Sequence, residues 1–149
     1  FIYAFLNELW QNIARLVKAQ MYISYAILII AIVVLIFNYD KAYTALNCGY
    51  AIVLLSLQLF VVKGAYMGKF YRFYFWHLIP FFIVNGILTG TGIDQEVVWY
   101  NNTENLGIRM GTIPVEDSLY SLSLMLMNIT ILEYLKSRFK KHNQIPIVA

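Results

Sequence analysis

The chain has 149 residues, of which 60% are hydrophobic and only 13% are charged, and its mean hydropathy is +0.63. This composition leaves too few polar groups to cover a soluble globular domain, so it predicts a protein surrounded by lipid. The net charge of +3 does not indicate nucleic-acid binding, because the basic residues lie just outside apolar runs. The single cysteine, Cys48, excludes an internal disulfide and a cysteine-based zinc site. We expect it to be a small packed residue within a membrane span.

Residues 1–18 are expected to hold the tail of a preceding transmembrane helix and a cytoplasmic linker. The apolar stretch at residues 1–10 is too short and wrongly flanked for a signal peptide. Residues 2–7 also show a short similarity to residues 131–136. This similarity suggests a duplicated protein whose first repeat is missing, with residues 19–41 as the helix that links the two repeats.

Three uncharged apolar runs follow, at residues 19–39, 42–62 and 73–93. At a rise of about 1.5 Å per residue, each run is long enough as a helix to cross a hydrocarbon core of about 30 Å. We therefore predict three transmembrane helices. His77 in the third run is expected to be a hydrogen-bonded side chain within the membrane, because the only other histidine, His142, is too far away in sequence for a convincing metal pair.

A fourth helix is predicted over residues 113–135, with Pro114 in its first turn. It differs from the others because it carries Glu116, Asp117 and Glu133. Carboxylates are unfavourable in hydrocarbon unless they are protonated, paired or facing a cavity, so within a span they mark a functional site by default. The expected fold class is an all-α, polytopic transmembrane helix bundle. It would have four spans here plus the end of a fifth, and about seven in a complete two-repeat protein.

The connections between these helices alternate in charge. One set is basic, namely the segments before the first helix, between the second and third, and after the fourth: Arg15, Lys18, Lys63, Lys69, Arg72, Lys136, Arg138, Lys140 and Lys141. The other two connections are acidic or nearly neutral. The positive-inside rule therefore predicts that the basic loops and a basic tail at residues 136–149 are cytoplasmic, in a bacterial inner membrane.

Residues 97–120 concentrate polar and aromatic side chains in one stretch: Trp99, Tyr100, Asn101, Asn105, Arg109, Glu116, Asp117 and Tyr120. The glycines and the proline of this stretch would let the chain turn back and direct the acids into the bundle. Adjacent residues in a helix diverge by about 100°, so one acid is expected to meet a substrate while the other supports it. The alternative is a capped helix start in which Arg109 forms a salt bridge with an acid.

Several cofactor motifs are absent from the sequence. It contains no GxGxxG after a strand, no aspartate-rich DDxxD-like stretch and no lysine within a predicted span. A Rossmann flavin or nicotinamide site, a magnesium diphosphate site and a retinal Schiff base are thus unsupported. We expect neither a cofactor nor a metal.

Four segments together resemble a known family: LIPFFIVNGILTGTGI at residues 78–93, VVWYN at 97–101, NLGIRMGTIPVED at 105–117 and ILEYLKSR at 131–138. They are similar to the C-terminal repeat of the membrane-integral, flavin-independent lycopene cyclases of carotenoid biosynthesis. The central element is a proline, any residue and two acids, at residues 114–117. Here the second acid is Asp117, where many relatives have Glu.

The resemblance implies an isomerase, or intramolecular lyase, that converts the linear ψ-ends of lycopene or a related acyclic carotenoid into β-ionone rings without net redox change. Residues 42–135 would form one three-helix repeat that works with the missing first repeat, either fused or as a separate subunit, in the lipid bilayer. Glu116 and Asp117 would serve as acid and base, in an order that the sequence leaves open. The remaining candidates are supporting residues and aromatic residues that shield a carbocation: Arg109, Asn105 and Asn101 for support, and Trp99, Tyr100 and Tyr120 for substrate or cation contact. The alternative function is a non-catalytic carotenoid-binding or assembly subunit.

Overall fold

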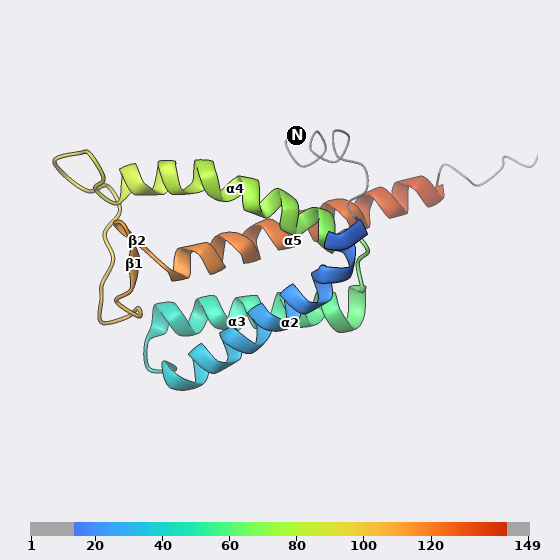
Figure 1. Cartoon of the computed structure of the whole chain (residues 1–149), viewed down its shortest axis with the longest axis horizontal. Coiled ribbons are helices and arrows are strands. Elements are labelled where there is room, and N and C mark those ends of the chain that lie inside the picture. The colour runs from blue at the N-terminus through green and yellow to red at the C-terminus, as the bar shows by residue number, and fades with distance from the viewer. Residues whose placement is uncertain (1–13, 143–149) are drawn as a thin grey trace, which may run out of the picture.

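The computed structural model describes residues 14–142, and it is mostly helical (Figure 1). Its elements in chain order are α2 (Ala14–Phe37), α3 (Ala42–Ser56), the π-helix η1 (Leu57–Val62), α4 (Met67–Leu88), β1 (Arg109–Met110), β2 (Ile113–Pro114) and α5 (Glu116–His142). The expected helix tail at residues 1–10 and the end of the basic tail, at residues 143–149, lie outside the described residues. The predicted helical fold class is confirmed, with one short hairpin added to it.

Three stretches of these helices are long and apolar enough to cross a membrane, by length and composition: Ala19–Phe37, Ala42–Val62 and Glu116–Phe139. Two of them coincide with the uncharged runs at residues 19–39 and 42–62, and the third coincides with the predicted acid-bearing span at residues 113–135. The third predicted span, at residues 73–93, does not meet the same measure. Its helix, α4, contains Arg72, His77, Pro80 and Asn85, whose polar or helix-breaking character lowers the mean hydropathy.

The fourth predicted helix begins later than the sequence suggests. Pro114 does not lie in the first turn of α5, because residues 113 and 114 form β2, which pairs antiparallel with β1. A residue before proline is pushed towards extended conformations, so Ile113 disfavours a helix here. Gly111 has a φ of +65° and closes the hairpin. The first turn of α5 follows directly after the hairpin in the chain, so the hairpin fixes where this helix begins.

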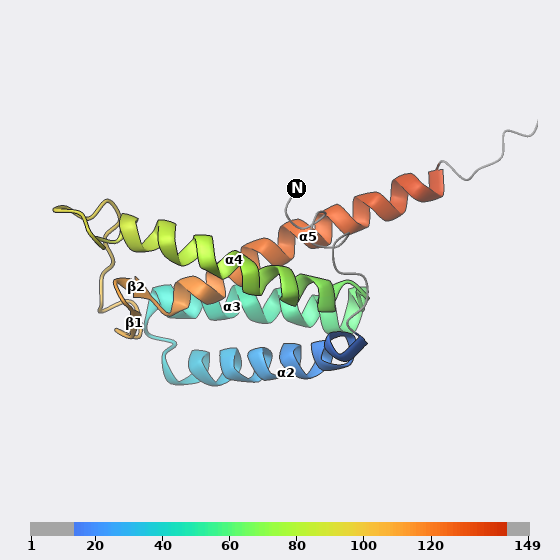
Figure 2. The same cartoon turned by 45° about the horizontal axis from the view of Figure 1, so that its top comes forward.

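The helices run lengthwise beside one another, and residues 89–115 close one end of the bundle (Figures 1 and 2). Leu28 of α2, Leu55 of α3, Phe70 of α4 and Leu126 of α5 share one buried core cluster. Hydrogen bonds join α2 to α4: Ser24 Oγ lies 2.6 Å from Tyr71 Oη, and the backbone N–H of Gly68 donates to the amide oxygen of Gln20. The four helices therefore form one packed unit.

Two sequence expectations about single side chains are confirmed. Cys48 is only 2% exposed and packs inside the bundle. His77 Nε2 lies 3.1 Å from Ser121 Oγ, within hydrogen-bonding distance. Cys48 is thus packed and His77 is within hydrogen-bonding distance of a partner, as the sequence predicts, while the place of His77 within the membrane stays a prediction.

The beginning of α2, the end of η1 and the beginning of α4 gather at one end of the bundle, and α5 extends out at the same end (Figure 1). The three basic segments predicted from the sequence, before the first helix, between the second and third helices and after the fourth, belong to these parts of the chain. The α2–α3 connection and residues 89–115 lie at the opposite end. This grouping agrees with the alternation of charge along the sequence, and we propose that the basic end is cytoplasmic.

We expect single cysteines at the two ends to react from opposite faces of the membrane. In a Cys48→Ala background, Lys69→Cys and Ser137→Cys should react with a membrane-impermeant maleimide only after the cells are lysed. Asp94→Cys should react in intact spheroplasts. The Cys48→Ala protein without an added cysteine is the control, and labelling of residues 69 and 137 from different faces would contradict this topology.

Candidate active site

Two adjacent acids, Glu116 and Asp117, form the first turn of α5. Both are buried, with side chains 3% and 4% exposed. The hairpin holds them in place, since the N–H of Val115 donates to the carbonyl of Ile108 at 3.0 Å. A helix N-terminus favours negative charge, so this position stabilises whichever of the two acids is ionised.

The two oxygens of Glu116 have different surroundings. Oε1 accepts hydrogen bonds from the Thr44 hydroxyl at 2.8 Å and from the Leu106 N–H at 2.6 Å. Oε2 is buried and has no hydrogen-bond partner. A buried polar atom without a partner is unfavourable and calls for an explanation, such as a bound proton or a ligand.

Asp117 is held on both oxygens by phenols. The Tyr43 hydroxyl donates a short hydrogen bond to Oδ1, and the Tyr100 hydroxyl donates to Oδ2 at 2.6 Å. Hydrogen bonds to an ionised carboxylate are the short and strong ones in proteins. The adjacent acids therefore differ: Asp117 is enclosed by donors, while Glu116 keeps one oxygen free.

Tyr100 connects Asp117 to Arg109. The Arg109 guanidinium lies 5.9 Å from the centre of the Tyr100 ring, and it donates to the Thr112 carbonyl at 2.6 Å and to Asn102 Oδ1 at 2.7 Å. Burial, together with the hydrogen bond and the charge of Asp117, raises the pKa of the Tyr100 phenol. Tyr100 thus remains a protonated donor to Asp117, and Arg109 lies against the same ring.

Asn101 and Asn105 shape the loop that reaches the acids. Asn101 Oδ1 accepts hydrogen bonds from the N–H and the hydroxyl of Thr103. Asn105 is only 2% exposed, and its Oδ1 accepts from the Gly107 N–H at 2.7 Å. Such side-chain turns fix the path of a loop. The Asn105 turn positions the neighbouring Leu106 N–H that binds Glu116.

Trp99 and Tyr120 lie further out than Tyr100. Their side chains are 73% and 46% exposed, and neither lines the cavity beside Glu116. The structure thus brings Tyr100 to the acids and leaves the other two predicted aromatic residues at the surface of the described chain. Their contact with a substrate remains a prediction.

A cavity of about 300 Å³ adjoins Glu116. Its walls come from α2, from Cys48 of α3, from Tyr74 of α4 and from residues 106–122, and most of the lining is apolar. Glu116 is its only carboxyl group among the described residues. The Tyr74 hydroxyl donates to the Ser118 carbonyl at 2.5 Å, which ties α4 to α5 across this space.

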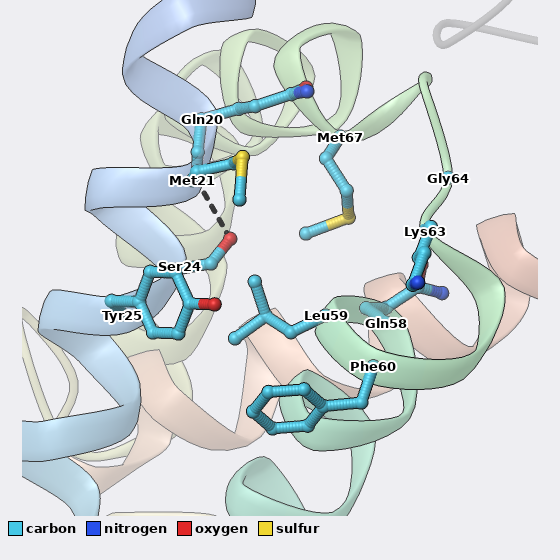
Figure 3. Close-up of a pocket in the computed structure, with 10 residues that line it drawn as sticks. All are labelled: Gln20, Met21, Ser24, Tyr25, Gln58, Leu59, Phe60, Lys63, Gly64 and Met67. Carbon is cyan, nitrogen blue, oxygen red and sulfur yellow. Dashed lines mark hydrogen bonds between the residues drawn. The ribbon is translucent and has the colours of Figure 1, made fainter.

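A second cavity, of about 480 Å³, lies at the other end of α2, between that helix, η1 and the start of α4 (Figure 3). Its polar lining consists of Gln20, Ser24, Gln58 and Lys63, among aromatic and methionine side chains. Among the described residues it contains no carboxyl group, whereas the smaller cavity contains that of Glu116. Within the described residues, no cluster of three His, Cys, Asp or Glu side chains is suited to a metal ion.

Sequence reasoning missed Tyr43 and Thr44, which donate to the two acids from the start of α3. The predicted span seemed almost free of polar groups, and these partners are 74 and 72 residues away from the acids in sequence. One feature of the sequence could have indicated these contacts, namely small or polar residues repeated at helical spacing. They form a buried face of α3: Thr44, Asn47, Cys48 and Ala51. Such a face predicts close contact with another helix.

Glu104 was also missed, although it fixes the start of α3. Its carbonyl accepts the N–H groups of Tyr43 and Thr44, at 3.0 and 3.3 Å. Its carboxylate accepts the Ala42 N–H at 3.1 Å. These bonds satisfy helix N–H groups that have no partner within the helix, and they hold Tyr43 and Thr44 beside the acids.

Comparison with known proteins gives one finding. The model of a family described as lycopene cyclase matches residues 40–135, which is more than half of the chain. No curated protein and no solved structure matches the chain significantly. The matched residues include α3, α4, the hairpin and both buried acids.

We expect Thr44→Val to lower the free energy of unfolding by about 1 to 2 kcal/mol, because it removes a hydrogen bond to a buried carboxyl group. Thr44→Ser keeps the hydroxyl and is the matched control. Unfolding of the purified proteins in detergent, followed by loss of helical circular dichroism, measures the difference. Equal destabilisation by Val and Ser would argue against this hydrogen bond.

Proposed function

The chain belongs to the lycopene cyclase family, and from this membership we propose that it is a β-cyclase, or one half of a β-cyclase. Its reaction would convert the linear ψ-ends of lycopene into β-ionone rings. We further propose that residues 42–135 form one repeat of the enzyme and act with a second repeat, fused or separate. The observation that carries the proposal is the free oxygen of Glu116 beside an apolar cavity.

Glu116 is our candidate for the acid. Both donors to this side chain bind Oε1, so Oε2 is the oxygen that can carry a proton. We propose that Glu116 carries this proton, because its Oε2 has no hydrogen-bond partner and the adjoining cavity is mostly apolar. This proton would add to a carbon of the terminal double bond of the substrate and leave a tertiary carbocation.

Asp117 is our candidate for the group that stabilises this cation. Its two oxygens accept hydrogen bonds from the phenols of Tyr43 and Tyr100, which would hold a carboxylate in place. A fixed negative charge close to a developing positive charge lowers the barrier, especially where water is excluded. Asp117 does not itself line the cavity, so its contribution would be electrostatic.

Ring closure and proton loss complete the proposed reaction. The electron pair of the neighbouring double bond attacks the cation and forms the six-membered ring, which moves the positive charge to a ring carbon. Loss of an adjacent ring proton restores a double bond. Glu116 is the only carboxyl group among the described residues that line the cavity, so we propose that this proton returns to its carboxylate. No electrons are gained or lost overall.

The location suits a hydrocarbon substrate. A carotenoid dissolves in the bilayer rather than in water, and it would reach the site from the side. Ile30 lines the cavity and is also 61% exposed on α2, which supports an approach between the helices from lipid. The apolar walls would keep water from the carbocation.

We expect Glu116→Gln to abolish cyclisation, with a loss of at least about a hundredfold, because general acid catalysis contributes about that much. The full-length gene would be expressed in lycopene-accumulating bacteria, and the pigments separated by chromatography. Glu133→Gln is the matched control, since Glu133 pairs with Lys136 far from the cavity. Unchanged lycopene from a folded wild-type protein would refute the cyclase proposal and favour the non-catalytic carotenoid-binding subunit.

We expect Tyr43→Phe and Tyr100→Phe each to lower the rate of cyclisation by about tenfold, through loss of one hydrogen bond to Asp117. The effect should fall on kcat rather than on KM, because the charge of Asp117 acts on the cation and not on the neutral substrate. Tyr22→Phe is the control, since Tyr22 is 78% exposed and does not line the cavity. A rise in KM alone would contradict this role for Asp117.

A further inference from the structure

The helix α2 lies outside the family match, which begins at residue 40, yet it forms one wall of the cavity beside Glu116. Ile27, Ile30, Ala31 and Val34 of this helix line the cavity. Their spacing of three and four residues places them on one face of the helix. The predicted role of α2 as a linking helix does not account for this wall.

The wall is held in a fixed position. Leu28 of α2 is 7% exposed and belongs to the buried core with Leu55 and Phe70. Nearer the start of the helix, Ser24 and Gln20 bind α4 through the Tyr71 hydroxyl and the Gly68 N–H. Packed side chains and fixed hydrogen bonds resist displacement, so the distance between the α2 wall and Glu116 is set by the fold.

The size of the cavity depends strongly on Ala31. This side chain is 2% exposed, and it is the smallest of the four α2 residues in the wall. A volume of about 300 Å³ holds roughly ten water-sized groups. That is about the size of a methylated six-membered ring, so a larger side chain at position 31 would remove a substantial part of the space.

We propose that α2, through Ala31 and Ile27, determines which acyclic end groups fit beside Glu116. Unsubstituted hydrocarbon ends would fit, and ends that carry an additional branch would be excluded. The inference rests on the proposed cyclase function and adds a specificity-determining wall to it. Ala31 and Ile27 would act by size alone, because their side chains have no group that can exchange a proton.

The test compares Ala31→Leu with Ala26→Leu in the full-length protein. Both changes add an isopropyl group to α2, but Ala26 is exposed and does not line the cavity. We expect Ala31→Leu to lower kcat/KM for lycopene by about tenfold or more, as a misfit of this size does in apolar binding sites. Ala26→Leu should leave it unchanged. Equal effects of the two variants would overturn the proposal.

A second change separates loss of space from misfolding. Ile27 lies one turn from Ala31, so Ile27→Ala should return volume to the same cavity and restore most of the activity of Ala31→Leu. Alone, Ile27→Ala should admit acyclic ends with an added branch. Failure of both the rescue and the broadened range would exclude a role for α2 in specificity.

Bound pigment gives a readout that does not depend on turnover. Lycopene copurified with the membrane protein is measured by its absorbance, and we expect less of it with Ala31→Leu than with Ala26→Leu. If the wild-type protein binds lycopene without cyclising it, the cyclase proposal fails while the α2 wall is still tested. Equal pigment in both variants would count against the wall.

Discussion

The arrangement of this bundle depends on one requirement: two carboxyl groups buried at the start of a membrane-length helix must be given hydrogen-bond donors. A carboxyl oxygen in a water-excluding interior is unfavourable without a partner. Three of the four carboxyl oxygens accept hydrogen bonds. The donors are the hydroxyls of Thr44, Tyr43 and Tyr100 and the Leu106 N–H. These donors come from α3 and from the loop before α5, so the acids fix both parts of the chain around them.

The same requirement accounts for the irregular segment at residues 89–115. A tight turn between α4 and α5 would be shorter, but it would not bring a backbone N–H and a phenol to the acids. The hairpin and the Asn105 turn give the loop a defined path, and Glu104 attaches it to the first turn of α3. Loop and helices therefore form one site, in which Oε2 of Glu116 is the one oxygen of the two acids without a hydrogen-bond partner.

Patterns within a segment were predictable from sequence, and contacts between distant segments were not. Uncharged runs located the helices, and the unusual acids in a span pointed to Glu116 and Asp117. The short hairpin was missed because proline fits two positions equally well: the first turn of a helix, and an extended segment just before a helix. Pro114 takes the second of these positions. The donors Tyr43 and Thr44 escaped notice because tyrosine and threonine at the start of a span are unremarkable until tertiary packing aligns them with the acids. The cavity wall on α2 also depends on how the helices pack, and a local sequence pattern does not predict that packing.

The two phenols on Asp117 come from segments that are far apart in the chain, and this has a consequence for biogenesis. Tyr43 enters the membrane early in synthesis, whereas Asp117 leaves the ribosome only after the whole of α4 and its loop. Until α5 docks against α3, Asp117 lacks the Tyr43 donor and is better solvated by water or headgroups than by hydrocarbon. Docking of α5 against α3 would therefore complete the burial of α5. The helix would reach its final depth in the membrane in the same step in which it associates with its neighbour.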